Sequence, residues 1–289
     1  MLTFIEHISL AGDRAKQNDD ACGAQGACAW VIDGATDLHD TPTTDYASDA
    51  QWLATQLNST LFEALNQYDL LGADEADIRQ EIARASAQVS EEYREVYAPP
   101  PDEPRWRSPT AALLIVSELD KSGIVGVDLG DCRCFALDAS GAAFASGGQG
   151  RPPDREAAMA AEAAKRVGSG PLLRDAQTLD VLRAQRATHN TAGSYWVFGL
   201  QPECADHARA WTLELQRPAH LLLCTDGFSA LVDRYAAYDA GGLVRAALER
   251  GLQDLGRELR AIEADDHGGA RHPRWKRSDD ATALLLRLS

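Results

Sequence analysis

The sequence predicts an α+β fold that contains a mostly antiparallel sheet. Short apolar strands at 113–117, 124–128 and 132–137 follow one another with tight turns between them, and strands joined by hairpins pair antiparallel. Two longer segments, 45–68 and 75–96, carry apolar residues at helical spacing. No repeat of fixed period and no low-complexity linker divides the 289 residues, so we expect one domain.

The other expected elements follow in chain order. A first strand covers 2–10, and a second, 28–33, ends in an Asp-Gly turn. Helices are expected at 154–167, which is rich in Ala, and at 176–187. The remaining predicted segments are strands at 195–198, 210–216 and 221–225, helices at 229–235 and 242–263, a mobile polar loop at 265–277 and a last strand from 281.

The bulk composition is ordinary for a soluble globular protein, with 45% hydrophobic and 25% charged residues. The net charge of −16 argues against nucleic-acid binding, which needs a basic surface, and against docking on an anionic membrane. No stretch approaches 18 consecutive apolar residues, and residues 1–10 lack the pattern of a secretion signal. We therefore expect neither a transmembrane helix nor an export signal.

The six cysteines provide a further indication of the compartment. They form no C-x-x-C motif and have no His partners at zinc-finger spacing. We interpret them as mostly reduced core residues of a cytoplasmic protein.

Acidic residues mark the ends of four predicted strands. Asp33, Asp131 and Asp226 each follow an apolar strand beside a glycine, and Asp279 precedes the last strand. Taken singly, an Asp beside Gly is an ordinary turn residue. Two bare carboxylates about 4 Å apart repel by roughly 4 kcal/mol at an effective dielectric constant of about 20. If these strand ends meet, a divalent cation is the usual means of holding them together.

These turns belong to a longer series of short motifs between residues 18 and 282. In chain order they are Asn18-Asp19-Asp20, Val31-Ile32-Asp33-Gly34, Ser108-Pro109-Thr110-Ala111, Gly130-Asp131-Cys132-Arg133, Thr225-Asp226-Gly227 and Asp279-Asp280-Ala281-Thr282. With this series the chain resembles the metal-dependent protein phosphatases, the type 2C Ser/Thr phosphatases. The resemblance implies two packed, mostly antiparallel sheets flanked by helices, in a single domain over 1–289 with a variable flap around 147–216.

The resemblance also implies a metal centre with two Mn²⁺ or Mg²⁺ ions. Asp33 would bridge the two ions, and the Gly34 carbonyl would ligate one of them. Asp226 and Asp279 would complete the first-metal site. A weaker third ion near Asp131 is left open. Oxygen ligands of this kind suit hard cations that keep several water ligands.

Three acids would act beside the ions. Asp19 and Asp20 would orient bound water, and Asp131 would lie nearby. A water that bridges two divalent ions loses a proton more easily and can attack phosphorus in line. The reaction therefore needs no nucleophilic Cys or Ser.

The substrate phosphate would be held by a basic residue before the acidic pair, and here the chain departs from the family. Arg14 lies five residues before Asp19, where four is the common spacing, and Lys16 lies three before it. Either Arg14 or Lys16 is thus a candidate for substrate binding. After Gly34 the chain also lacks the His and Gly pair that is frequent in the family. His39 follows soon after, but we expect it to be structural.

The resemblance implies a phosphatase that acts on phosphoserine or phosphothreonine in proteins. Its partners would be a phosphorylated protein and a cognate Ser/Thr kinase. Two alternatives stay open: a phosphatase of small phosphorylated metabolites on the same scaffold, and a catalytically weak pseudophosphatase that acts as a binding or regulatory module. The altered spacing of the basic residue favours the second, whereas the retention of Asp33, Asp226 and Asp279 argues against it.

Overall fold

The computed structural model describes residues 1–13, 15–67, 73–119, 123–148, 153–168, 172–266 and 269–289, and it places ten strands of that part of the chain in two sheets. One sheet has the strand order β1-β10-β9-β6-β7, and the other has the order β2-β3-β4-β5-β8. All neighbouring strands in both sheets pair antiparallel. The predicted α+β class and the pair of antiparallel sheets are therefore confirmed.

The bounds of the elements are as follows. The strands are β1 (Leu2–Leu10), β2 (Ala21–Gln25), β3 (Cys28–Gly34), β4 (Ala111–Leu119), β5 (Gly123–Leu129), β6 (Arg133–Leu137), β7 (Ala143–Gly147), β8 (Arg209–Glu214), β9 (Ala219–Cys224) and β10 (Ala281–Leu288). The helices are α1 (Asp49–Gln67), α2 (Glu75–Val96), α3 (Pro153–Val167), α4 (Ala176–Arg186), α5 (Asp226–Asp233), α6 (Ala240–Arg250) and α7 (Leu252–Asp265), with short 3₁₀ turns at Arg105–Arg107, Leu172–Arg174 and Pro202–His207. None of the described helices is both long enough and apolar enough to cross a bilayer.

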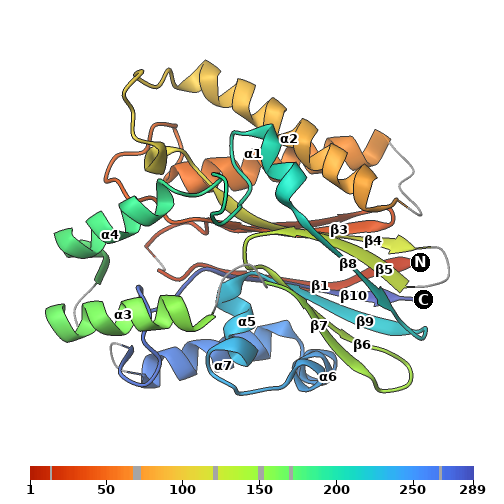
Figure 1. Ribbon diagram of the computed structural model, residues 1–289. Coiled ribbons are helices and arrows are strands. Elements are labelled where there is room, and N and C mark those ends of the chain that lie inside the picture. The colour runs from red at the N-terminus through yellow and green to blue at the C-terminus, as the bar shows by residue number, and fades with distance from the viewer. Residues whose placement is uncertain (14, 68–72, 120–122, 149–152, 169–171, 267–268) are drawn as a thin grey trace.

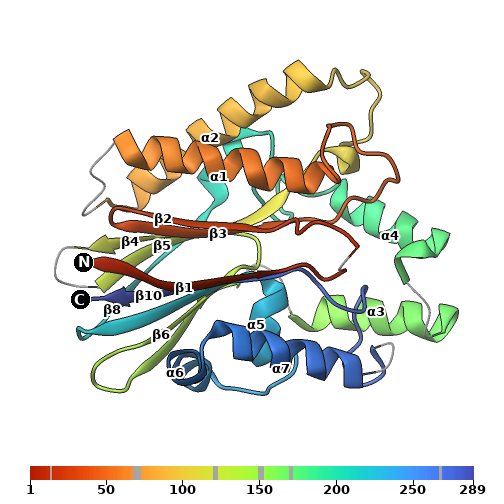
Figure 2. The ribbon, with the colours of Figure 1, turned by 180° about the vertical axis from the view of Figure 1, so that it is seen from behind.

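Helices cover both outer faces of the paired sheets (Figure 1). The helices α1 and α2 lie over the sheet that contains β3, and α5, α6 and α7 lie over the sheet that contains β9. The helices α3 and α4 lie at one end of the sandwich, away from the two chain termini, and the view from behind agrees (Figure 2). The predicted segment 147–216 thus contains α3 and α4 at this end, together with β8, which pairs with β5 as a strand of a sheet.

Three apolar layers hold this arrangement together. Trp30 and Leu57 belong to the layer between the helix pair and its sheet, Val31 and Leu221 to the layer between the sheets, and Phe228 to the layer under α5–α7. Successive residues of β3 point to opposite faces, so Trp30 and Val31 enter different layers. Strands that are covered on both faces consist of continuous apolar runs. This pattern allowed such strands to be predicted from the sequence.

Three strand predictions differ from the structure, and one of the differences is β7 (Ala143–Gly147), which was not expected. The strand β2 was missed, because its residues Ala21–Gln25 are small or polar. A Cβ atom on Gly23 would lie 2.4 Å from the Trp30 ring, so the bulk of the neighbouring strand requires a small residue there. The predicted strand at 195–198 is reduced to a single bridge between Phe198 and Ala111.

The C-terminal half differs in two further respects. The single helix predicted at 242–263 is two helices, α6 and α7, which are separated by Gly251 at a φ of 80°. Only glycine adopts this backbone conformation without strain. Of the loop predicted to be mobile at 265–277, residues 267–268 lie outside the described part of the chain, and residues 269–277 are held by the buried side chain of Arg274. Of the predicted turn at 120–123, residues 120–122 lie outside the described part of the chain.

Candidate metal centre

The four acids at the strand ends line one cleft between the two sheets. Asp33 ends β3, Asp131 lies in the turn between β5 and β6, Asp226 opens α5 directly after β9, and Asp279 precedes β10. The cleft has a volume of about 160 Å³. The backbone N–H of Asp226 donates to Oδ2 of Asp33 over 3.3 Å, so two of the acids are in direct contact. These four strand ends therefore meet at one cleft, as predicted.

Glycines let the loops at this edge approach one another. A Cβ atom on Gly34 would lie 2.4 Å from the backbone oxygen of Asp19, and one on Gly227 would lie 1.8 Å from that of Asp280. Real Cβ atoms essentially never come so close to backbone oxygens. The glycines beside Asp33 and Asp226 are thus required by close backbone contact with the segments that carry Asp19 and Asp280.

Asp19 and Asp20 lie against the same edge. The Ser48 hydroxyl donates to Oδ1 of Asp19, and burial, the largest effect, nevertheless raises the pKa of Asp19 to about 6. Thr225 Oγ1 donates to Oδ2 of Asp20 over 2.9 Å. The other oxygen of Asp20, Oδ1, is buried and accepts no hydrogen bond from the described residues. Burial first, and then nearby Asp280, raises the pKa of Asp20 well above its usual range.

Negative charge accumulates around Asp33. Burial, then Asp226 and then Asp20, raises the pKa of Asp33 well above its usual range. Repulsion of this kind is relieved when a cation binds among the carboxylates. The donors on offer are all oxygen atoms, which suit Mg²⁺ or Mn²⁺. The unpaired Oδ1 of Asp20 and this donor set both fit a hard divalent cation.

Comparisons with known proteins bear on the fold. The sequence matches no protein-family model and no curated protein. The structure of the PPM Ser-Thr phosphatase MsPP from Mycobacterium smegmatis, in complex with cacodylate, matches with a TM-score of 0.56 and 18% identity, over 99% of this chain and 100% of that one. The catalytic domain of the serine threonine protein phosphatase PstP, in complex with 2 manganese ions, matches with a TM-score of 0.55 and 13% identity, over 99% of each chain. RsbX in complex with magnesium matches with a TM-score of 0.50 and 13% identity, over 100% of each chain.

The chain has the fold of the PPM Ser/Thr phosphatases. The match extends over both sheets and both helical layers, since it covers nearly the whole chain. Its low identity makes it a likeness of fold, and the chemistry has to be argued from the residues of this cleft.

Of the two basic residues expected from the sequence, only Lys16 can be placed relative to this cleft. Lys16 is exposed and is absent from the described lining residues, and Arg14 lies outside the described part of the chain. The Lys and Arg side chains that do line it are Lys276 and Arg186. Neither residue was predicted. Lys276 belongs to a basic run that was interpreted as a solvated loop. Its position three residues before Asp279 was the available signal.

Lys276 is in direct contact with one of the acids. Its Nζ atom lies 2.8 Å from Oδ1 of Asp279. Burial alone would lower the pKa of Lys276, but the Asp279 carboxylate outweighs this effect and holds that pKa above its usual range. Arg260 of α7 donates to the backbone oxygen of Asp279 over 2.8 Å, which fixes the acid from behind.

The helix α4 forms one wall of the cleft in this version of the PPM fold. Arg186 donates to the backbone oxygen of Thr36 over 2.6 Å, and Arg183 donates to that of Leu38 over 2.7 Å. The Arg183 guanidinium also lies 4.6 Å from the centre of the Trp106 ring. These contacts attach α4 to the segment that follows Asp33 and Gly34, so this wall of the cleft is fixed to the end of β3.

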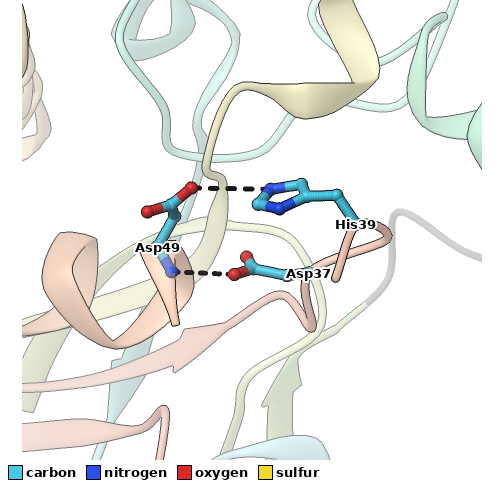
Figure 3. Close-up of side chains that lie close together, drawn as sticks. All are labelled: Asp37, His39 and Asp49. Carbon is cyan, nitrogen blue, oxygen red and sulfur yellow. Dashed lines mark hydrogen bonds and ion pairs between the residues drawn. The ribbon is translucent and has the colours of Figure 1, made fainter. Parts of the chain in front are cut away.

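A second group of possible metal ligands lies beside this segment (Figure 3). It consists of Asp37, His39 and Asp49, whose ligand atoms lie within 4.8 Å of one another. In the described residues it is the only set of three whose ligand atoms all lie within 4.8 Å of one another. The carboxylate oxygens of the acids in the cleft therefore lie farther apart than this. Figure 3 shows the His39 ring facing Asp49, with Nε2 3.5 Å from Oδ2, and Asp37 accepting the backbone N–H of Asp49.

The hydrogen bonds of this group identify it as a structural contact. Oδ1 of Asp49 accepts from Thr43 N, Thr44 N and Thr44 Oγ1, and Oδ2 accepts from Thr43 N and Thr43 Oγ1. A carboxylate offers about four lone-pair sites, so neither oxygen of Asp49 is left for a metal ion. The group organises the loop before α1, in agreement with the expectation that His39 is structural.

Proposed function

We propose that the chain is a metal-dependent phosphatase that hydrolyses phosphoserine or phosphothreonine. One observation carries the proposal. Asp33, Asp131, Asp226 and Asp279 reach a single cleft of a PPM fold from four separate segments of the chain. Such a cluster of carboxylates is unfavourable without a cation. An aspartate that only stabilised its own turn would not need to lie near the other three.

In this proposal Asp33 holds two Mn²⁺ or Mg²⁺ ions, with Gly34, Asp226 and Asp279 as further ligands. Manganese in the matched PstP structure and magnesium in the RsbX structure support this choice of ions. When bound, the ions would supply Lewis acidity toward the phosphoryl oxygens and lower the pKa of an attacking water. The number of ions, including a third near Asp131, is part of the proposal.

The chain's own residues would perform the other tasks. Asp20, oriented through Oδ2 by Thr225, has its second oxygen available to accept a proton or a hydrogen bond from water. Asp19, held by Ser48, would orient water at the edge of the cleft. The wall formed by α4 would narrow the entrance and reduce the access of bulk solvent.

The test is hydrolysis of an aryl phosphate and of a phosphothreonine peptide with Mn²⁺, with Mg²⁺ and with chelator. Asp226→Asn should lose the metal-dependent turnover, because an amide neutralises one ligand. The matched control is Asp254→Asn, which removes a half-buried acid of α7 that pairs with Arg250 at the end of α6 and should leave turnover unchanged.

The alternatives are distinguished by the same assay. Turnover of the aryl phosphate without preference for the peptide would favour a phosphatase of small phosphorylated metabolites. Absence of turnover with either metal, in a folded protein, would overturn the enzymatic proposal and leave a binding module on the PPM scaffold.

A further inference from the structure

Lys276 is placed to act on a ligand in the cleft as well as on Asp279. It lines the same cleft as Asp33 and Asp226, and its side chain is 28% exposed. An ammonium group has three N–H donors. The contact with Oδ1 of Asp279 uses one of them, so two can be directed to another acceptor.

The loop that carries Lys276 is fixed in place by the buried Arg274. The Arg274 guanidinium forms an ion pair with the buried Asp266 and donates to the backbone oxygens of Glu263, His272 and Arg277. Asp266 in turn accepts the backbone N–H groups of Arg271 and His272, over 2.8 and 3.2 Å. A segment bonded at so many points presents Lys276 in a defined position.

A second contact attaches this loop to the flap helix. The Trp275 ring packs against the small cluster of Ala160, Ala163 and Leu172, which joins α3 to the turn that follows it. Lys276 comes directly after Trp275, so its position is fixed both by the loop and by the contact with the turn Leu172–Arg174, whose Leu173 lines the cleft. The ammonium group is therefore preorganised, and preorganised charges are the ones that stabilise a bound anion most effectively.

Charge balance shows why a cation is needed here. Two divalent ions would only neutralise the four lining carboxylates, before Asp19 and Asp20 are counted. A phosphate monoester that enters with close to two negative charges would then meet no net positive charge. Lys16 is exposed and absent from the described lining. Of the two cations in that lining, Arg186 already bonds the Thr36 backbone.

We propose that Lys276 binds the phosphoryl oxygens of the substrate. The assignment rests on the proposed phosphatase function. Lys276 would contact the phosphoryl group through its remaining N–H donors while Asp279 holds its position. It would therefore contribute to the affinity for phosphate and to the stabilisation of the transferred group.

The experiment compares Lys276→Gln and Lys276→Arg with the wild type. The readouts are KM and kcat for an aryl phosphate, the affinity of the Mn²⁺-loaded protein for inorganic phosphate by calorimetry, and the affinity for Mn²⁺ itself. The control is Lys165→Gln, since Lys165 forms an exposed ion pair with Glu162 at the same three-residue spacing. Circular dichroism and melting temperature establish that each variant is folded.

Lys276→Gln should weaken phosphate binding and raise KM by about tenfold or more, the range expected for a hydrogen bond to a charged group. Its affinity for Mn²⁺ should not decrease, and Lys276→Arg should recover part of the phosphate affinity. Unchanged phosphate affinity, with only Mn²⁺ binding weakened, would overturn the assignment and make Lys276 a positioning residue for Asp279. Loss of phosphate binding in Arg14→Gln or Lys16→Gln, but not in Lys276→Gln, would overturn it as well.

The two proposals fail in different ways. If the wild type shows no turnover, the phosphatase function fails, and the calorimetry still decides whether Lys276 binds phosphate. If the wild type turns over and Lys276→Gln keeps the wild-type KM and phosphate affinity, the phosphatase stands and the role of Lys276 falls.

Discussion

The backbone N–H of Asp19 donates a hydrogen bond of 2.8 Å to Oδ2 of Asp280, across 261 residues of sequence. The other oxygen of Asp280 accepts the N–H of Gly12 over 2.7 Å. One carboxylate at the start of β10 thus holds both ends of the segment that leads into the acidic pair. Asp280 shapes the cleft through the backbone, which distinguishes it from its neighbour Asp279.

This relationship predicts the cost of removing Asp280. Asp280→Ala leaves two backbone N–H groups without their acceptor, so we expect a loss of about 2 kcal/mol in the free energy of unfolding. Asp280→Asn keeps one acceptor oxygen and should lose about half of that. Urea denaturation of both variants measures the difference. Equal stability of the alanine variant and the wild type would show that these bonds are replaced by water at no cost.

A second prediction concerns the contact between Gly34 and Asp19. Gly34→Ala would place a methyl group 2.4 Å from a backbone oxygen. The loops must separate, so we expect a loss of about 1–3 kcal/mol in stability, together with a large loss of metal-dependent turnover. Urea denaturation and the phosphatase assay measure the two effects.

Gly199→Ala is the control for this change. The nearest atom to its added methyl group would lie at 3.4 Å, and we expect wild-type stability and turnover. A Gly34→Ala variant with wild-type turnover would show that the ligand loops tolerate separation.

The sequence predicted the sheets and the acidic edge because both depend on local signals. A strand such as β4 is apolar throughout, and each Asp is followed or preceded by its own strand. The meeting of Asp33 with Asp226 then follows from strands that end at the same edge. Helix α2 was predicted with its bounds because Asp74 caps it at one end and prolines follow it at the other.

Features that depend on distant partners could not be predicted in this way. Arg274 looks like one of several surface cations in a polar run, and only its pairing with Asp266 explains its burial. Lys276 acquires its role from that fixed loop. The small residues of β2 carry no strand signal, because the Trp30 ring decides what fits beside it. In each case a tertiary contact overrides the local pattern.

The pair of Asp266 and Arg274 leads to a prediction for pH. Burial would raise the pKa of Asp266, but hydrogen bonds from Arg271 and the charge of Arg274 hold it below its usual value. A carboxylate whose pKa is lowered by folding stabilises the folded state at pH values above its unfolded-state pKa of about 3.9. This contribution is lost as the pH falls through the pKa of the folded state.

Asp266→Asn should therefore destabilise the protein by about 3 kcal/mol at pH 7, because it leaves a buried arginine unpaired. The difference from the wild type should narrow as the pH falls below about 4, where the carboxylate of the unfolded state is protonated first, and should vanish below the lower pKa of the folded state. Urea denaturation from pH 7 to the acid limit measures it. A difference that stays constant with pH would show that the Asp266 charge contributes nothing.

A last prediction separates the cleft from the group of Asp37, His39 and Asp49 as the site of metal binding. Mn²⁺ should raise the melting temperature of the wild type, since an ion at about a hundred times its dissociation constant stabilises the folded state by about 2.7 kcal/mol. Asp226→Asn should lose most of this shift, because the ligand set of the cleft is broken. His39→Gln should lower the melting temperature without metal, because the ring packs against Asp49, yet retain the full Mn²⁺ shift. The reverse pattern, with the shift lost only in the His39 variant, would place the ion at the loop before α1 and remove the metal argument from the cleft.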